Sequence, residues 1–213
     1  MNWWTRAPVL LILGLLGTHA RVCGAVNVDV ESFGCKPGGQ VCTGAFNKAV
    51  TYVSTNGGGV LHVRGPGAYT VAGIEMKSDV ILQVHEGATI NASQRLSDWG
   101  PRRLVLPACA TAEPAELERG VLGGLFYASL AHNFTIRGCG PACSATVNGA
   151  ARAWNGYGVE TRNKDLVAPA PAPPNPLGLI RSNMFVFSQC TDIVVEDLQI
   201  QDSSGALLAL NTV

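Results

Sequence analysis

The distribution of hydrophobic and polar positions repeats three times along the chain. In each copy, polar residues lead into a β-branched run, and a second apolar run follows shortly afterwards. The copies are 78–83 followed by 88–90, 132–137 followed by 145–147, and 191–196 followed by 198–200. Self-similarity without helices between the copies is typical of a β-solenoid, in which each repeat stacks on the one before it. The pattern therefore predicts an all-β solenoid.

One segment has helical rather than strand spacing. Its apolar residues fall at i, i+3, i+4 and i+7, and they are Phe46, Ala49, Val50 and Val53. This spacing predicts an amphipathic helix from Thr43 to Thr55, with Thr43 as its N-cap and the glycines at 57–59 ending it. Because the helix precedes the repeats, we expect it to cap the open N-terminal end of the solenoid.

Shorter patterns fill the rest of the N-terminal region. Residues 27–33 alternate as a strand, 60–63 read as a buried strand, and 69–76 continue as short strands after the turn at 65–67. Two later segments, 94–124 and 163–177, lack this regularity. We interpret both as loop insertions, and the proline-rich run within the second predicts an extended, polyproline-like conformation.

The composition agrees with a protein made of strands and turns. The 213 residues include 25 glycines and 12 prolines, and only 14% of the residues are charged. Glycine and proline are the residues that turns require, and the length suits a single domain with a sizeable core. The formal net charge is zero, so no basic surface for nucleic acid is predicted.

Residues 1–25 have the order of a secretory signal peptide. Arg6 supplies a basic start, 7–17 form an apolar run, and Ala20 and Ala25 offer two cleavage positions. The apolar run is shorter than the ~20 residues that span a bilayer. We therefore expect a signal peptide at 1–25, a domain at 26–213, and a secreted protein, extracellular or in a cell wall, with no membrane partner after cleavage.

Cysteine usage agrees with export. Cleavage after Ala25 leaves six cysteines, which are Cys35, Cys42, Cys109, Cys139, Cys143 and Cys190. An even number in an exported chain favours disulfides, although free thiols and the pairing itself stay open. The close pairs 35/42 and 139/143 are poorly spaced for zinc, because nearly a hundred residues separate them.

Two sequons are candidate glycosylation sites. They begin at Asn91 and Asn133, and their use requires exposure in a secretory host. Asn133 also starts a predicted strand, so a purely structural role as a turn residue is the alternative there.

Several short motifs occur in an order found in one enzyme family. They comprise 28–34, 43–63 with its Gly-Gly-Gly strand, 67–69, 76–80, 86–90, 125–128, 133–138, 146–149 and 153–154. Over roughly residues 28–210 the chain resembles the polygalacturonase family, which are pectin-cleaving glycoside hydrolases. The resemblance implies a right-handed parallel β-helix and hydrolysis of polygalacturonan with inversion. Asn148 stands where the family usually has aspartate.

The resemblance does not extend to the family's catalytic motifs. Its carboxylates lie in Asn-Thr-Asp-Gly and Gly-Asp-Asp segments that this sequence lacks, and Asn211-Thr212 is followed by Val213. The carboxylates of the last repeat, Glu196, Asp197 and Asp202, are interpreted as an exposed polar edge, because they form no evident acid–base pair. We therefore assign no catalytic residue in this chain.

No cofactor or metal site is predicted either. The histidines are His19, His62, His85 and His132, and no two of them have metal-ligand spacing in the sequence. We expect each of the last three to lie alone, satisfied by hydrogen bonds. The sequence also lacks the acidic cluster that a calcium-dependent lyase would need.

Two function classes follow from these observations. In the first, the chain is the N-terminal part of a longer, polygalacturonase-like hydrolase that acts on pectin or polygalacturonan and is monomeric at full length. This fragment, an incomplete β-helix, is then inactive alone. In the second, it is a truncated or non-catalytic secreted β-helix that binds polysaccharide. The sequence beyond the codon for Val213 discriminates between the two.

Overall fold

The computed structural model describes residues 25–99, 124–140, 142–150, 183–203 and 207–211. The predicted signal peptide, the loop insertion at 163–177 and most of the one at 94–124 lie outside these residues. Cys109 lies outside them as well. No described helix is long and apolar enough to cross a membrane.

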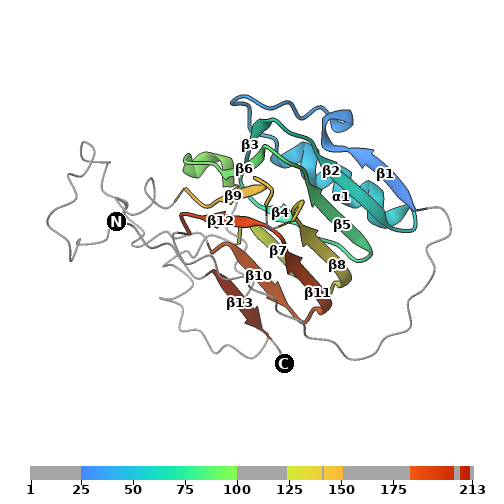
Figure 1. Ribbon diagram of the computed structural model, residues 1–213. Coiled ribbons are helices and arrows are strands. Elements are labelled where there is room, and N and C mark those ends of the chain that lie inside the picture. Colours follow the sequence, from blue (N-terminus) through green and yellow to red (C-terminus); the bar gives the residue numbers. More distant parts are fainter. Residues whose placement is uncertain (1–24, 100–123, 141, 151–182, 204–206, 212–213) are drawn as a thin grey trace, which may run out of the picture.

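The described chain is mostly β-structure, arranged in three parallel sheets with one α-helix (Figure 1). Sheet A contains β1 (Val26–Asp29), β2 (Gly59–Val63), β5 (Val80–Val84), β8 (His132–Arg137) and β11 (Thr191–Glu196). Sheet B contains β3 (Gly67–Val71), β6 (Ala88–Ala92), β9 (Thr146–Asn148) and β12 (Gln199–Gln201). Sheet C contains β4 (Ile74–Glu75), β7 (Phe126–Ser129), β10 (Phe185–Ser188) and β13 (Leu208–Asn211).

From β2 onward the chain visits sheets A, B and C in the same order four times. Each strand pairs in parallel with the strand one repeat away, so Ile81 lies opposite Thr135, which lies opposite Val194. The three sequence copies thus occupy equivalent places in neighbouring repeats. The prediction of stacked parallel strands is confirmed for the described residues.

Alternation within the strands places the core between the sheets. In β2, β5 and β6, every second residue is buried and the residues between are half-buried. Buried rows run through the repeats, as in Leu61, Leu82 and Ile136 of sheet A. In sheet C, the rings of Phe126 and Phe185 stack with centroids 5.3 Å apart. Burial of each such side chain contributes roughly 1.5–3 kcal/mol to folding.

The polar residues that open each sequence copy have a backbone role. Asp79, Asn133 and Asp192 have φ values of 64°, 51° and 55°, in the left-handed region. Aspartate and asparagine tolerate this region better than other residues with side chains. The Asn133 amide also donates to Asp79 Oδ1 over 2.7 Å, which ties neighbouring repeats together at this corner.

The predicted helix is present with the expected bounds, α1 (Thr43–Thr55), and its four predicted apolar residues are fully buried. The prediction of Thr43 as N-cap is wrong. Cys42 is the capping residue, and Thr43 Oγ1 instead accepts the backbone N–H of Ala72 over 2.7 Å. The Asn47 side chain accepts the N–H of Glu75 over 2.8 Å. The helix is thereby attached to the strands of the first repeat.

The predicted strand at 27–33 is only half correct. β1 ends at Asp29, and residues Val30–Phe33 form a 3-10 helix, η1. The turn places Val30 in the core and ends at Gly34, whose φ of 90° favours glycine. The alternation of apolar and polar residues does not distinguish a strand from a 3-10 turn here, because one turn of 3-10 helix also buries an isolated apolar residue.

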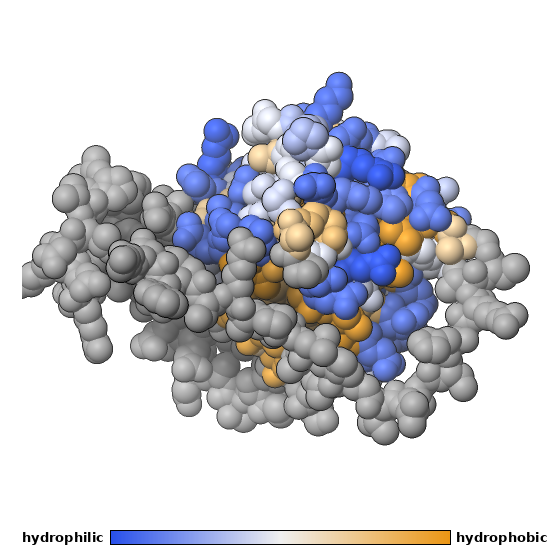
Figure 2. Space-filling model, viewed as in Figure 1, coloured by the Kyte–Doolittle hydropathy of each residue, from blue (hydrophilic) through white to orange (hydrophobic). Residues whose placement is uncertain are grey.

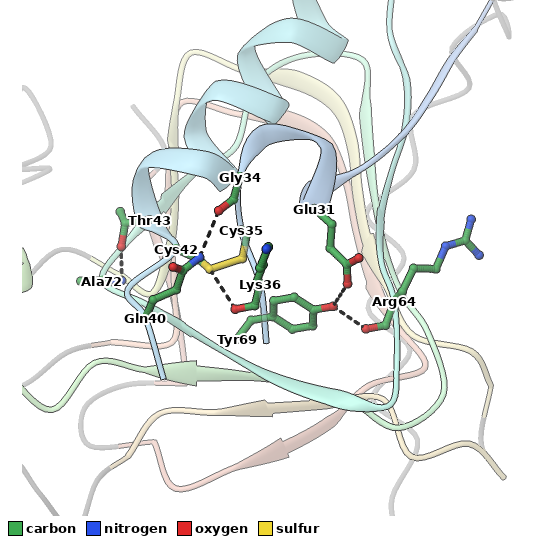
Figure 3. Close-up of a disulfide and its surroundings, with 10 residues drawn as sticks. All are labelled: Glu31, Gly34, Cys35, Lys36, Gln40, Cys42, Thr43, Arg64, Tyr69 and Ala72. Atoms are coloured by element: carbon green, nitrogen blue, oxygen red, sulfur yellow. Dashed lines mark hydrogen bonds between the residues drawn. A yellow bond between two sulfur atoms is a disulfide. The ribbon is translucent and has the colours of Figure 1, made fainter. Parts of the chain in front are cut away.

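Two disulfides join the close cysteine pairs, Cys35–Cys42 and Cys139–Cys143. The first closes the loop that connects η1 to α1 (Figure 3). Within this loop, Gln40 donates to the carbonyl of Gly34 over 3.0 Å. Cys190 pairs with no cysteine in the described part of the chain, and it is half-buried.

Candidate functional site

A groove with a volume of about 440 Å³ lies along the outer side of sheet B. One wall comes from the disulfide-closed loop, where Val41 forms a parallel bridge with Thr70 of β3. The floor and the other wall come from sheet B and from the segments that leave β6, β9 and β12. The groove therefore crosses several repeats.

The floor is a row of polar side chains set by strand register. Thr70, Asn91 and Asn148 line the groove and lie opposite one another on successive strands of sheet B. Asn148 Oδ1 accepts the backbone N–H of Ala150 over 2.9 Å, which holds the turn after β9. Among the described residues, the Asn91 side chain makes no hydrogen bond. Its amide is thus available to a ligand as both donor and acceptor.

The segment after β6 folds on itself and presents two charged residues to the groove. Ser93 is buried, and its hydroxyl donates to Asp98 Oδ2. Trp99, in η2 (Leu96–Trp99), donates its indole N–H to the Ser93 carbonyl over 3.0 Å. These bonds position Asp98 and Arg95, which both line the groove.

The structure separates the carboxylates of the last repeat. Asp202 lines the groove, whereas Glu196 ends β11 in sheet A and Asp197 occupies the following corner with a φ of 56°. Among the predicted edge residues, only Asp202 reaches the groove. Sequence reasoning missed Asp98, which lies in a segment interpreted as a loop. The only feature of the sequence that could have pointed to Asp98 is the nearby Ser93, whose hydroxyl donates a hydrogen bond to it.

The expectation that each histidine lies alone is wrong. His62 and His85 come from neighbouring repeats on the outer side of sheet A, and His62 Nδ1 lies 2.9 Å from His85 Nε2. Sequence spacing hid this pair, because 23 residues separate them and only the strand register brings them together. Burial is the main cause that lowers the pKa of both imidazoles, and the Arg64 charge adds to it.

His132 also has partners. Its Nδ1 lies 3.1 Å from Ser78 Oγ, and its Nε2 lies 3.9 Å from Asp79 Oδ2. The side chains of His132 and Asp79 are 61% and 42% exposed, and the Ser78 hydroxyl also accepts the His132 backbone N–H. These contacts belong to the corner between repeats, and they do not form an enclosed nucleophile site.

Tyr69 connects the N-terminal turn to the first repeat. Its ring is buried against Phe46, and its hydroxyl lies 2.9 Å from Glu31 Oε1 and 2.7 Å from the carbonyl of Arg64 (Figure 3). Burial, together with the hydrogen bond to Glu31, raises the pKa of the phenol. Tyr69 is thus a neutral structural donor beneath the disulfide-closed loop.

The hydrophobic surface lies elsewhere. Figure 2 shows hydrophobic residues gathered on the lower part of the described surface, where Figure 1 places β7, β10 and β13. Leu208 and Leu210 of β13 are 39% and 41% exposed. The sheet B groove is instead lined mainly by polar and small residues.

Comparison with known proteins gives structural likeness only. No family model and no curated protein matches the sequence. A protein from Parabacteroides merdae described as a glycosyl hydrolase superposes with a TM-score of 0.60 at 22% identity, covering 87% of this chain and 69% of its own. At these identities the likeness defines the fold and not the activity.

Two exopolygalacturonases are similar in the same way. The enzyme from Thermotoga maritima has a TM-score of 0.59 at 20% identity, covering 84% of this chain. The family 28 enzyme from Yersinia enterocolitica has a TM-score of 0.57 at 16% identity, covering 83%. The chain spans 42% and 35% of the lengths of these two enzymes. The described fold is therefore glycoside hydrolase-like.

Proposed function

We propose that this chain is part of a secreted, polygalacturonase-like glycoside hydrolase that acts on pectin or polygalacturonan. The observation that carries the proposal is the fourfold visit to three parallel sheets, together with the likeness to two exopolygalacturonases. In this proposal the sheets form a right-handed parallel β-helix, with α1 as the cap of its first turn. The complete protein is monomeric, and the sheet B groove binds the polysaccharide.

The chemistry of the groove suits a sugar polymer. Asn91 and Asn148 offer amide groups at strand spacing, about 4.8 Å apart. Hydroxyl-rich ligands need such paired groups. Arg95 adds a guanidinium, whose planar fork matches a uronate carboxylate. A groove that crosses several repeats also allows more than one sugar unit to bind.

Hydrolysis with inversion requires one carboxyl group to protonate the leaving oxygen and another to activate water. Asp98 and Asp202 are the carboxylates that line the groove. Asp98 accepts a hydrogen bond from the Ser93 hydroxyl, so one of its carboxylate oxygens is already engaged within the protein. We therefore propose that this chain supplies binding groups, and that by itself it binds the polymer without cleaving it.

The test measures binding and cleavage separately on disulfide-intact protein. Titration with oligogalacturonate should show binding that Arg95→Gln weakens and that Lys48→Gln leaves unchanged. Lys48 is the matched control, because it is exposed on α1 and does not line the groove. Loss of binding in the Lys48 variant, or no binding at all, would refute the groove as the polysaccharide site.

Reducing-end release from polygalacturonate gives the second measurement. We expect none from residues 26–213. Sustained release that Asp202→Asn abolishes would place catalysis in this chain and contradict our view. The alternative function, a non-catalytic secreted β-helix that binds polysaccharide, is favoured by the groove alone. It predicts the same binding, but no release even from the complete natural gene product.

A further inference from the structure

An exposed valine stands at one end of the otherwise polar floor of the sheet B groove. Val41 is 41% exposed, lines the groove and forms a parallel bridge with Thr70. Strand register then places Asn91 opposite Thr70, and Asn148 opposite Asn91. Because residues paired in parallel strands present their side chains on the same face, Val41 is the first member of this row. A ligand along the row therefore meets an apolar side chain at the disulfide-closed loop and amides further on.

The disulfide-closed loop holds Val41 in a fixed place. The backbone N–H of Cys42 donates to the Thr70 carbonyl over 2.7 Å, and the N–H of Gly38 donates to the Ala68 carbonyl over 3.0 Å. The loop is thus bonded to β3 on both sides of Val41, and the disulfide joins its two ends (Figure 3). A β-branched side chain on a held backbone has little freedom to lose, so apolar contact with it costs a ligand little entropy.

The charges of the lining are unfavourable for a polyanion. Arg95 is the only cation among the described residues that line the groove, whereas Asp98 and Asp202 both contribute carboxylates. Lys36, in the disulfide-closed loop, is exposed but does not line the groove. One positive formal charge against two negative ones leaves the lining with a net charge of −1. This surplus repels a polymer with a free carboxylate on every sugar unit, although Arg95 can pair with one of those carboxylates.

We propose that the groove selects partly methyl-esterified polygalacturonan over the fully ionised polymer, with Val41 as a specificity-determining residue. The inference rests on the proposed function of the groove and names its preferred substrate. Methyl esterification adds an apolar group and removes a negative charge at the same position, so one modification suits both the valine and the surplus of carboxylates. An acetyl ester on a sugar hydroxyl also supplies a methyl group, but it leaves the neighbouring carboxylate charged.

The experiment is a calorimetric titration of the disulfide-intact protein at pH 7 with oligogalacturonates of equal length. One ligand is fully ionised, one carries methyl esters on alternate units, and one carries acetyl groups at the same density. We expect the methyl-esterified ligand to bind about four-fold more tightly than the fully ionised one, or better. Burial of one methyl group alone gives roughly this factor, which corresponds to ~0.8 kcal/mol, and relief of the repulsion adds to it.

Two substitutions separate the two causes of the preference. Val41→Thr keeps the β-branched shape but replaces a methyl group with a hydroxyl, and it should weaken binding of the methyl-esterified ligand by roughly three-fold. Asp202→Asn removes a carboxylate, and it should reduce the preference by strengthening binding of the fully ionised ligand. Val194→Thr is the matched control, because Val194 is 37% exposed on β11 in sheet A and does not line the groove. The control should keep the preference unchanged.

The outcomes distinguish this inference from the proposed function. No binding of any of the three ligands would refute the groove as the polysaccharide site, and the inference with it. Equal affinities for the methyl-esterified and fully ionised ligands, or an unchanged preference in Val41→Thr, would overturn the inference while polysaccharide binding stands. An acetylated ligand that binds as tightly as the methyl-esterified one would also overturn it, because removal of the charge would then have no effect.

Discussion

One of the tightest approaches between neighbouring repeats gives a sharp test of the stacking. At Gly138, a β-carbon would lie 1.9 Å from the Asp197 carbonyl oxygen, which belongs to the next repeat. Ordinary contacts begin at 3.4 Å, so Gly138→Ala must separate the two backbones by about 1.5 Å if strand geometry is to be kept. The hydrogen bond from the Gly138 N–H to the Glu196 carbonyl, now 3.0 Å long, would then break.

The cost follows from these contacts. Overpacking a tight site costs ~1–3 kcal/mol, and the lost backbone hydrogen bond adds about 1 kcal/mol. We therefore expect Gly138→Ala to lower the free energy of unfolding by roughly 2–4 kcal/mol. With a urea slope of about 2 kcal/mol per molar, the midpoint should fall by ~1–2 M.

A matched substitution elsewhere in the chain should raise the free energy of unfolding instead of lowering it. Gly44 lies in the first turn of α1, and a β-carbon there would meet nothing within 4 Å. Gly44→Ala should raise stability by about 0.5–1 kcal/mol, because alanine loses less backbone entropy in a helix. Urea unfolding followed by circular dichroism measures both variants. Equal midpoints for the two would refute the close stacking of β8 on β11.

Further predictions concern pH, a buried phenol and glycosylation. Because the pKa values of His62 and His85 are lowered from 6.5, the unfolded chain binds more protons below that pH, and stability should fall as the pH drops through 6. A double glutamine variant should flatten this part of the urea-midpoint profile, and an unchanged slope would contradict the assignment. Tyr69→Phe should cost roughly 1–2 kcal/mol, since the hydroxyl hydrogen bonds are lost; a thermal midpoint equal to that of the unmodified protein would argue against them. In a secretory host, peptide mapping should find a glycan at exposed Asn133 rather than at half-buried Asn91, and the reverse occupancy would contradict the burial.

The elements that the sequence predicted well are those with local causes. The α1 stripe and the three repeats were visible because each depends on residues within a few positions of one another. The strand at 27–33 was only half correct, because the burial of Val30 in a 3-10 turn depends on packing with α1 and not on alternation. The N-cap was misplaced for a similar reason, since Thr43 bonds to Ala72 across the fold.

The residues of the groove and the histidine pair were harder to predict because strand register brings them together. Asn91 and Asn148 are neighbours in sheet B although 57 positions separate them in the sequence. The His62–His85 contact and the reach of Asp202 into the groove depend on register in the same way. The sequence showed that repeats exist, but the alignment of one repeat on the next required the structure.

The connections between sheets differ greatly in length, and this difference shows where the fold tolerates insertions. Two residues join β3 to β4, whereas 33 residues separate β6 from β7 and 36 separate β9 from β10. Both long connections run from sheet B to sheet C, and both leave from strands whose following residues line the groove. Lengthening a loop from 2 to 33 residues costs only ~2–3 kcal/mol of closure entropy. The register of the strands is unaffected, as Phe126 still pairs with Ile74. Insertions can therefore accumulate in the connections from sheet B to sheet C, next to the groove. They can change the surroundings of the groove without changing the pairing of the stacked strands.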